Sequence, residues 1–188
     1  MTLPPGAYPV TLRGASNGTG VGLIAVNDMD GSPLPKLMNI STRAFVGTGS
    51  NVAVGGFIIS GTGSKQVLIR GYGPTLEPAV GPGVLADPVI ELYADHDSNP
   101  LTPAILILSN DNWETDPPSC PAPAIVCGTA QDIRDTGKSA DAYAPTDPNR
   151  YRDSALLVTL PPGVYPVTLR GAGSGTGVGL IAVNEIGP

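Results

Sequence analysis

The sequence predicts an all-β fold: a two-sheet antiparallel β-sandwich of jelly-roll or immunoglobulin-like type, with about eight strands plus an extra N-terminal hairpin. The composition is the first reason, because 25 glycines and 21 prolines stand beside 41% hydrophobic and only 14% charged residues. The second is that short apolar runs are separated by Gly/Pro turns, and no segment beyond about ten residues lacks a helix breaker. The third is a repeat of one strand pair at both ends of the chain.

The repeat joins residues 2–28 to residues 159–185. The first reads TLPPGAYPVTLRGASNGTGVGLIAVND and the second reads TLPPGVYPVTLRGAGSGTGVGLIAVNE. They differ at only four of 27 positions: Ala7/Val164, Ser16/Gly173, Asn17/Ser174 and Asp28/Glu185. Chance does not produce such identity, so the segment is a duplicated unit.

Each copy has the pattern of a β-hairpin. Apolar residues alternate with Pro166, Thr168 and Arg170, a Gly/Ser turn spans 171–177, and a second apolar run follows at 178–183. Because an isolated hairpin is marginal in water, its apolar side chains need a cover. We expect assembly through these residues of the two copies: Tyr8, Val10, Leu12, Val21, Leu23, Ala25, Tyr165, Val167, Leu169, Val178, Leu180 and Ala182.

The repeat predicts two domains. Residues 1–30 form the hairpin, and residues 31–188 form the sandwich, with a long insertion at 110–152. The first copy is either the last hairpin of a preceding repeat in a tandem array or a pair of strands donated to another subunit. A local duplication that adds an edge hairpin is the remaining alternative.

Six further strands are predicted inside the sandwich by apolar alternation between turns: 37–46, 52–60, 66–71, 89–94, 104–109 and 154–160. The insertion exceeds an ordinary loop. We expect one helical turn at 130–135, and from the prolines we expect an ordered surface excursion rather than a second core.

The chain carries an ordered string of short motifs: NISTRAFVGTG at 39–49, VLIRG at 67–71, LADP at 85–88, NDNW at 110–113, APTD at 144–147 and the LPPGxY turn at 160–165. This string resembles a tandem β-sandwich repeat of large exported bacterial proteins. The resemblance spans nearly all of 36–186 and implies a modular surface or secreted protein. It implies no catalytic residues.

Charge and cysteine content point to an extracellular or cell-surface setting. The net charge is −6 with no basic run, so nucleic acid is not an expected partner, and no apolar stretch is long enough to span a bilayer. No secretion signal is expected in this chain. Cys120 and Cys127 are too few for a zinc site, and we prefer a disulfide to free thiols, which favours an oxidising compartment.

Candidate enzyme chemistry is weak. The glycine clusters fit tight turns rather than phosphate loops, and a Ser-His-Asp hydrolase would have to use the single histidine, His96, without a nucleophile-elbow motif. For Arg13, Arg70 and Arg170, which each precede a glycine, we expect cross-strand pairing with a carboxylate.

Two binding candidates remain. No cofactor is required, and Ca²⁺ is the one metal considered, with hard oxygen ligands from Asp95, Asp97, Asn99 and Asp111. Pro100 and Leu106 stand where an EF-hand has Gly and Glu. Trp113, with Tyr93, Tyr143 and Tyr151, is the candidate glycan platform.

The function expected is a non-enzymatic extracellular structural module. It would join copies of itself, or adjacent repeats, head to tail into a fibre, sheath or surface array by strand exchange through the repeated hairpin. The alternative is a carbohydrate-binding or adhesive cell-surface module.

Overall fold

The computed structural model describes residues 3–27, 39–95, 102–115, 118–120, 125–144 and 146–187, without the side chain of Tyr143. The chain divides into two compact units, Met1–Met38 and Asn39–Pro188. The larger unit is an antiparallel two-sheet β-sandwich of nine strands, which confirms the predicted fold class.

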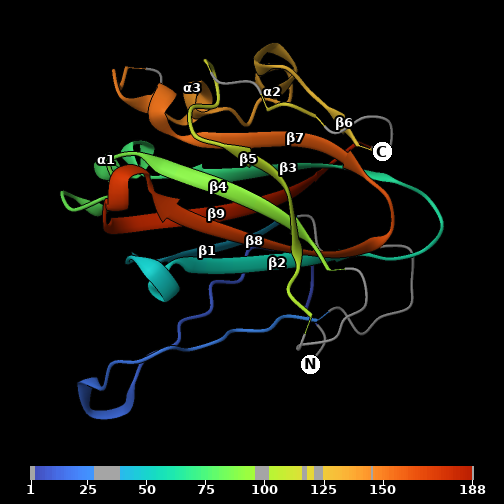
Figure 1. Cartoon of the computed structure of the whole chain (residues 1–188). Coiled ribbons are helices and arrows are strands. Elements are labelled where there is room, and N and C mark those ends of the chain that lie inside the picture. The colour runs from blue at the N-terminus through green and yellow to red at the C-terminus, as the bar shows by residue number, and fades with distance from the viewer. Residues whose placement is uncertain are drawn as a thin grey trace. The chain divides into compact units, whose positions relative to one another are not determined.

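The two sheets are defined by their strand order (Figure 1). Sheet A contains, in spatial order, β1 (Asn39–Val46), β9 (Gly177–Ile186), β3 (Lys65–Tyr72), β7 (Ser154–Leu160) and the short β6 (Val126–Cys127). Sheet B contains β2 (Ala53–Ile59), β8 (Gly163–Gly171), β4 (Pro88–Ala94) and β5 (Ile105–Asn110). The strands predicted for the sandwich therefore exist within a few residues of their expected bounds. Strand β6 was not predicted, because two residues carry no readable alternation.

The helices are all short. The α-helices are α1 (Glu77–Val80), α2 (Ala130–Asp135) and α3 (Ala140–Tyr143), and the 3-10 turns are η1 (Ala15–Asn17), η2 (Gly49–Asn51), η3 (Pro74–Leu76), η4 (Arg150–Arg152) and η5 (Ala172–Ser174). Helix α2 confirms the helical turn predicted at 130–135. It begins with a capping box, in which Thr129 accepts from the backbone N–H of Asp132 and the Asp132 carboxylate accepts from that of Thr129. Among the described residues, no helix reaches the length and apolar character needed to cross a membrane.

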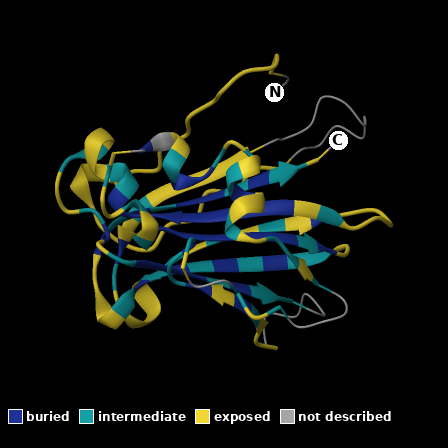
Figure 2. Cartoon of the chain, turned by 90° about the horizontal axis from the view of Figure 1, so that it is seen from above, coloured by how far each residue is buried: buried dark blue, intermediate teal, exposed yellow. Residues whose placement is uncertain are grey.

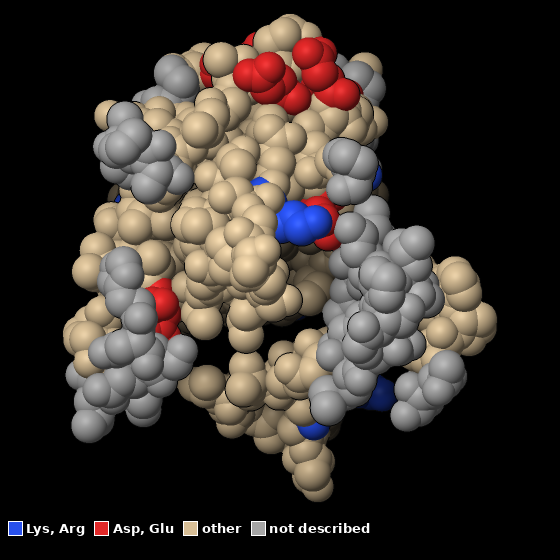
Figure 3. Space-filling model, turned by 90° about the vertical axis from the view of Figure 1, so that its right-hand side faces the viewer, with Lys and Arg blue, Asp and Glu red and all other residues tan. Residues whose placement is uncertain are grey.

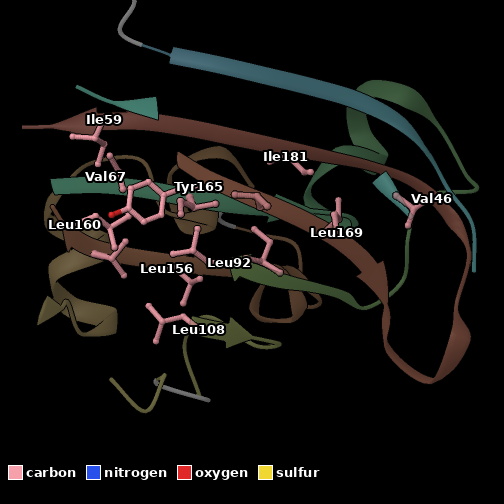
Figure 4. Packing of buried hydrophobic residues seen from close by; sticks show 14 of the residues in the cluster. Val46, Ile59, Val67, Leu92, Leu108, Leu156, Leu160, Tyr165, Leu169 and Ile181 are labelled. Atoms are coloured by element: carbon pink, nitrogen blue, oxygen red, sulfur yellow. The ribbon is translucent and has the colours of Figure 1, made fainter. Parts of the chain in front are cut away.

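The main core lies between the two sheets (Figure 4). Side chains alternate along each strand, so every second residue points inward. The labelled inward residues are Val46, Ile59, Val67, Leu92, Leu108, Leu156, Leu160, Tyr165, Leu169 and Ile181. Figure 2 shows the resulting pattern, with buried residues along the middle of the strands and exposed residues at the turns.

The insertion contradicts one expectation, because it does build a second apolar cluster. Leu68 of β3 and Leu157 of β7 face away from the main core, and they pack with Trp113 and with Ile133 of α2. Strands β3 and β7 are therefore buried on both faces. The prolines suggested a surface excursion, but both strands carry apolar residues on consecutive positions, and an outer apolar face requires a cover.

The predicted terminal hairpin is also wrong in its pairing. Strand β8 pairs with β2 and β4 in sheet B, whereas β9 pairs with β1 and β3 in sheet A. The connection through η5 is an arch between the sheets. It is held at the end of the sandwich where the N–H of Ala172 donates to the carbonyl of Asp87. Alternation identifies a strand, but it does not identify the partner of that strand.

The extra N-terminal hairpin is not formed either. Within 3–27 the structure has no strand, only η1, and each of these residues is exposed. A strand needs a neighbour to satisfy its backbone N–H and C=O groups, and no described residue of this unit forms one.

Candidate assembly site

The C-terminal copy occupies the middle of both sheets. Strand β8 lies between β2 and β4, and β9 lies between β1 and β3, so each has a partner at both edges. We call this place, filled by residues 163–184, the β8–β9 position. Because both strands are central, an empty position would break each sheet into separate parts and expose the core.

Strand β8 contributes its inner face to the core. Tyr165, Val167 and Leu169 are buried, and the latter two have no exposed surface. The ring of Tyr165 stacks on that of Phe57 with centroids 5.4 Å apart. Burial raises the pKa of the Tyr165 hydroxyl, which donates to the carbonyl of Pro161 at 2.8 Å. Each of these side chains contributes about 1.5–3 kcal/mol by burial.

Strand β9 presents a different inner residue from those expected. Ile181 is its side chain in the main core, whereas Leu180 and Ala182 pack in the second cluster on the opposite face. Val178 is half-buried. The run at 178–183 is apolar on both faces, so alternation alone could not show which face is the inner one. The two apolar clusters decide it, because the main core covers the face with Ile181 and the second cluster covers the face with Leu180 and Ala182.

Gly179 is a second residue that the sequence did not single out. A Cβ placed there would lie 2.8 Å from Leu169 Cδ2 and 3.0 Å from Val46 Cγ2. These distances are shorter than normal carbon contacts, so the close packing of β9 on the core needs glycine at this place.

Polar contacts fix β8 on the outer face of sheet B. Arg170 Nε donates to Glu91 at 2.8 Å, and the Thr168 and Tyr93 hydroxyls donate to the same carboxylate at 3.0 Å each. Burial alone would raise the pKa of Glu91, but the hydrogen bonds from Arg170, Thr168 and Tyr93 outweigh it and hold the pKa below its usual value. The carboxylate partner predicted for Arg170 is confirmed.

Polar contacts also fix β9 in sheet A. The amide oxygen of Asn184 accepts from Arg70 Nη2 at 2.5 Å, and Glu185 pairs with Lys65 at 2.9 Å. Arg70 is buried and also donates to the Tyr72 hydroxyl and to the carbonyl of Lys138. These three acceptors of Arg70 are neutral oxygens. These contacts join β3 and β9 to the insertion.

The first copy adopts the same local turns without the strands. Tyr8 donates to the carbonyl of Pro4 at 2.6 Å, as Tyr165 does to that of Pro161. In each copy a 3-10 turn closes with a 2.9 Å hydrogen bond, from Gly18 to Ala15 and from Gly175 to Ala172. Ser16 even takes the positive φ of 52° that Gly173 takes at 55°. Residues 3–27 therefore have the local turns of the arch although they form no strand.

The first copy also keeps every residue that the β8–β9 position buries. The buried residues of the C-terminal copy are Tyr165, Val167, Leu169, Gly171, Gly177, Gly179, Ile181, Ala182 and Asn184. The corresponding residues are identical: Tyr8, Val10, Leu12, Gly14, Gly20, Gly22, Ile24, Ala25 and Asn27. The four differences all fall on positions that are half-buried or exposed in the sandwich: 164, 173, 174 and 185.

The apolar side chains predicted for assembly in the first copy are open to solvent. Val21 is 99% and Leu23 86% exposed, and Tyr8, Val10 and Leu12 are about half exposed. Ala25 is exposed as well. A segment that carries core residues at its surface is a candidate for binding to a sheet that lacks them.

The disulfide predicted between Cys120 and Cys127 is present, with Cα atoms 6.0 Å apart. Cys127 lies on β6 opposite Val158 of β7. The disulfide therefore links Cys120 of the insertion to β6, the edge strand of sheet A.

A charged network joins four residues of the insertion. Arg134 donates to Asp141 at 2.9 Å and to Glu114, and Arg150 donates to Asp141 at 2.6 Å. Burial would raise the pKa of Asp141, but these two guanidinium groups lower it overall. Figure 3 shows acidic side chains gathered at the top of the view, the end at which Figure 1 places α2.

Trp113, the main glycan candidate, is not accessible for stacking. Trp113 is 3% exposed, its Nε1 donates to the carbonyl of Arg150, and the Arg134 guanidinium lies 4.9 Å from its ring centroid. A sugar ring cannot stack on a face that the core and an arginine already cover. Tyr93 points its hydroxyl to Glu91, and Tyr151 is 37% exposed.

Only two of the four calcium candidates, Asp95 and Asp111, lie among the described residues. Asp97 and Asn99 lie outside the described residues, as does His96. The backbone N–H of Asp95 donates to the carbonyl of Val164, and Asp111 follows β5. Among described residues, no group of three or more His, Cys, Asp or Glu is arranged to hold a metal.

Comparison with known proteins adds no assignment. No protein-family model matches this chain, and no curated protein matches it.

Proposed function

We propose that this chain is a non-enzymatic structural module of an extracellular fibre, sheath or surface array, in which residues 3–27 supply strands β8 and β9 to a neighbouring sandwich. The neighbour is another copy of the chain or an adjacent repeat. The β8–β9 position of the neighbour must be open, which requires that the neighbour's own last two strands are absent or displaced. The module is thereby joined end to end by strands that are central in both sheets.

The observation that carries the proposal is the distribution of identities between the two copies. Each residue that is buried in the β8–β9 position has an identical counterpart in 3–27, and differences occur only where the position is not buried. Residues 3–27 therefore keep the full set of side chains that fill the position, including the counterparts of Gly179 and Ile181, which are Gly22 and Ile24.

The contacts available to the incoming segment are the ones seen in the sandwich. Tyr8 would stack on Phe57 of the neighbour, and Arg13 and Thr11 would donate to its Glu91. Main-chain pairing at both edges of each strand adds to this, as in other cases of strand addition. The disulfide supports an extracellular setting, and so do the motifs that resemble those of exported bacterial repeats.

The test is the oligomeric state of the full chain. We expect concentration-dependent association by sedimentation velocity, lost in Val10→Asp, because the counterpart Val167 has no exposed surface. Thr19→Asp is the matched control, since its counterpart Thr176 is exposed. Equal association in both variants contradicts the proposal.

A second test identifies the contact itself. Val54 pairs with Thr168 across β2 and β8, and the counterpart of Thr168 is Thr11. Chains carrying Thr11→Cys are mixed with chains carrying Val54→Cys, unfolded and refolded together, and oxidised. We expect a disulfide between chains, and none when Thr19→Cys replaces Thr11→Cys.

A further inference from the structure

We infer that the first copy is also a competing occupant of the β8–β9 position in its own sandwich. A single chain then has one β8–β9 position and two nearly identical segments that can fill it. This rests on the proposed fit of residues 3–27 to that position, but it concerns one molecule rather than a joint between two.

The connection to β1 permits this exchange. In sheet A, Asn39 at the start of β1 lies opposite Asn184 near the end of β9. The counterpart of Asn184 is Asn27, so in the exchanged state Asn27 would face Asn39. Paired residues of antiparallel strands are about 5 Å apart, whereas the eleven residues 28–38 reach up to roughly 35 Å. The first copy would enter as the hairpin partner of β1.

The rest of the sandwich needs no rearrangement. Strand β7 ends at Leu160, and only Pro161 and Pro162 connect it to Gly163 of β8. If residues 6–27 take the place of 163–184, the chain simply leaves the sheet after β7. Strands β1 to β7 keep their order and register, and both exchanged segments run in the same direction.

The balance between the two occupants depends on their tethers. The buried side chains are identical, so the contacts inside the sandwich differ little. The C-terminal copy is tethered by two residues and the first copy by eleven, and the entropy cost of closure grows with loop length. The structure, with residues 163–184 in place, has the more closely tethered occupant. A lesion in that segment reverses the balance.

Exchange also has a consequence for joining. It releases residues 161–188, which carry the same core side chains, for the β8–β9 position of a neighbour. In the exchanged chain, the C-terminal copy rather than the first copy is therefore available to bind a neighbour.

Four full-length chains test the inference by unfolding at low micromolar concentration. Val167→Asp places a charge in the core and should expel the C-terminal copy. We expect it to keep a cooperative transition with a lowered midpoint, because the first copy takes over. Val10→Asp alone should unfold as the unsubstituted chain does, and so should Thr19→Asp, the control. Val10→Asp with Val167→Asp should lose the cooperative transition. Equal loss in Val167→Asp alone overturns the inference.

Crosslinking then locates the rescuing segment. Thr11→Cys and Val54→Cys are combined with Val167→Asp in one chain, and the products are separated by size after oxidation. We expect a disulfide within the monomer and none when Thr19→Cys replaces Thr11→Cys. A crosslink found only between chains overturns the inference and leaves the proposed joining intact, whereas no crosslink of either kind overturns both.

Discussion

Residues 3–27 and 160–184 have almost the same sequence and different structures. Both form the Tyr–Pro hydrogen bond and the 3-10 turn of the arch. Only the second forms strands, and only the second has buried residues. The difference teaches which features of this segment are local: a turn closes within a few residues, whereas a strand exists only when another strand satisfies its backbone groups.

The largest expected difference between the copies concerns a core leucine. Leu169→Ala, made in a chain that carries Val10→Asp so that the first copy cannot replace it, should lower the free energy of unfolding by about 2–5 kcal/mol. Leu12→Ala should change it by less than about 0.5 kcal/mol, because Leu12 is about half exposed. Denaturant titration measures both. Similar losses at the two sites would mean that the first copy is packed as well.

A pH effect that belongs to the sandwich alone comes next in size. Asp153 is buried, accepts from the N–H of Gly73 at 2.7 Å, and burial raises its pKa from 3.8 to about 7. The folded state therefore binds a proton that the unfolded state releases above pH 3.8, so stability falls as pH rises from about 4 to 7.

Substitution isolates this effect. Asp153→Asn should flatten that pH dependence and stabilise the fold above pH 7 by on the order of 2 kcal/mol. Asp153→Asn and the unsubstituted chain are compared by denaturant unfolding between pH 4 and 8. A stability that still declines with pH in Asp153→Asn would place the responsible group elsewhere. Exchange of the two copies should leave the effect unchanged, because Asp153 lies outside both.

Tyr165 and its counterpart Tyr8 make the same hydrogen bond in a buried and in an exposed segment, so their substitution measures the effect of burial on that bond. Tyr165→Phe should cost about 1 kcal/mol, because the hydroxyl is held against Pro161 at the edge of the core. Tyr8→Phe removes the same bond from an exposed segment and should leave thermal unfolding unchanged. A measurable loss in Tyr8→Phe would show that the first copy contributes to the stability of the sandwich.

The smallest expected difference concerns the arginines. Arg170→Ala should cost a few tenths to about 1 kcal/mol at pH 7, because the partly exposed pair with Glu91 is screened by solvent. The pKa of Glu91 is lowered in the fold, so this contribution exists above its unfolded value of 4.5 and is lost as pH falls through the folded value.

The free energies of unfolding of Arg170→Ala and of the unsubstituted chain should therefore converge at acid pH. The difference between Arg170→Ala and the unsubstituted chain should shrink as the pH falls below 4.5 and through the folded pKa of Glu91, and Arg13→Ala should have no effect at any pH. A difference that is independent of pH across this range would assign the role of Arg170 to packing of its aliphatic stem rather than to charge.

Much of the fold was predictable from residues close together in the chain. Apolar alternation located the strands of the sandwich, the stretch at 130–135 was identified as a helical turn, and the spacing of Cys120 and Cys127 suggested their disulfide. Each of these depends on a short window. The prediction that the repeat forms a hairpin failed, because it required knowledge of a partner strand distant in sequence.

The candidate site shows the same limit at single residues. Tyr165, Val167 and Leu169 were identified as buried because they alternate with polar or proline neighbours. Ile181 was missed, because it stands in a run that is apolar on both sides. Trp113 was considered for sugar stacking, although the insertion folds it beneath Arg134. Which apolar face is covered depends on what folds over it.

The amino-acid order alone determined the repeat, the turns of the arch and the places where strands form, because these follow from residue type and from contacts within a few positions. The pairing of β8 and β9 in separate sheets, the second cluster under the insertion, and the contrast between the buried and the exposed copy came from long-range contacts. Backbone groups and apolar faces are satisfied only by partners that the whole chain brings together, so identical segments take different structures according to whether such partners are adjacent.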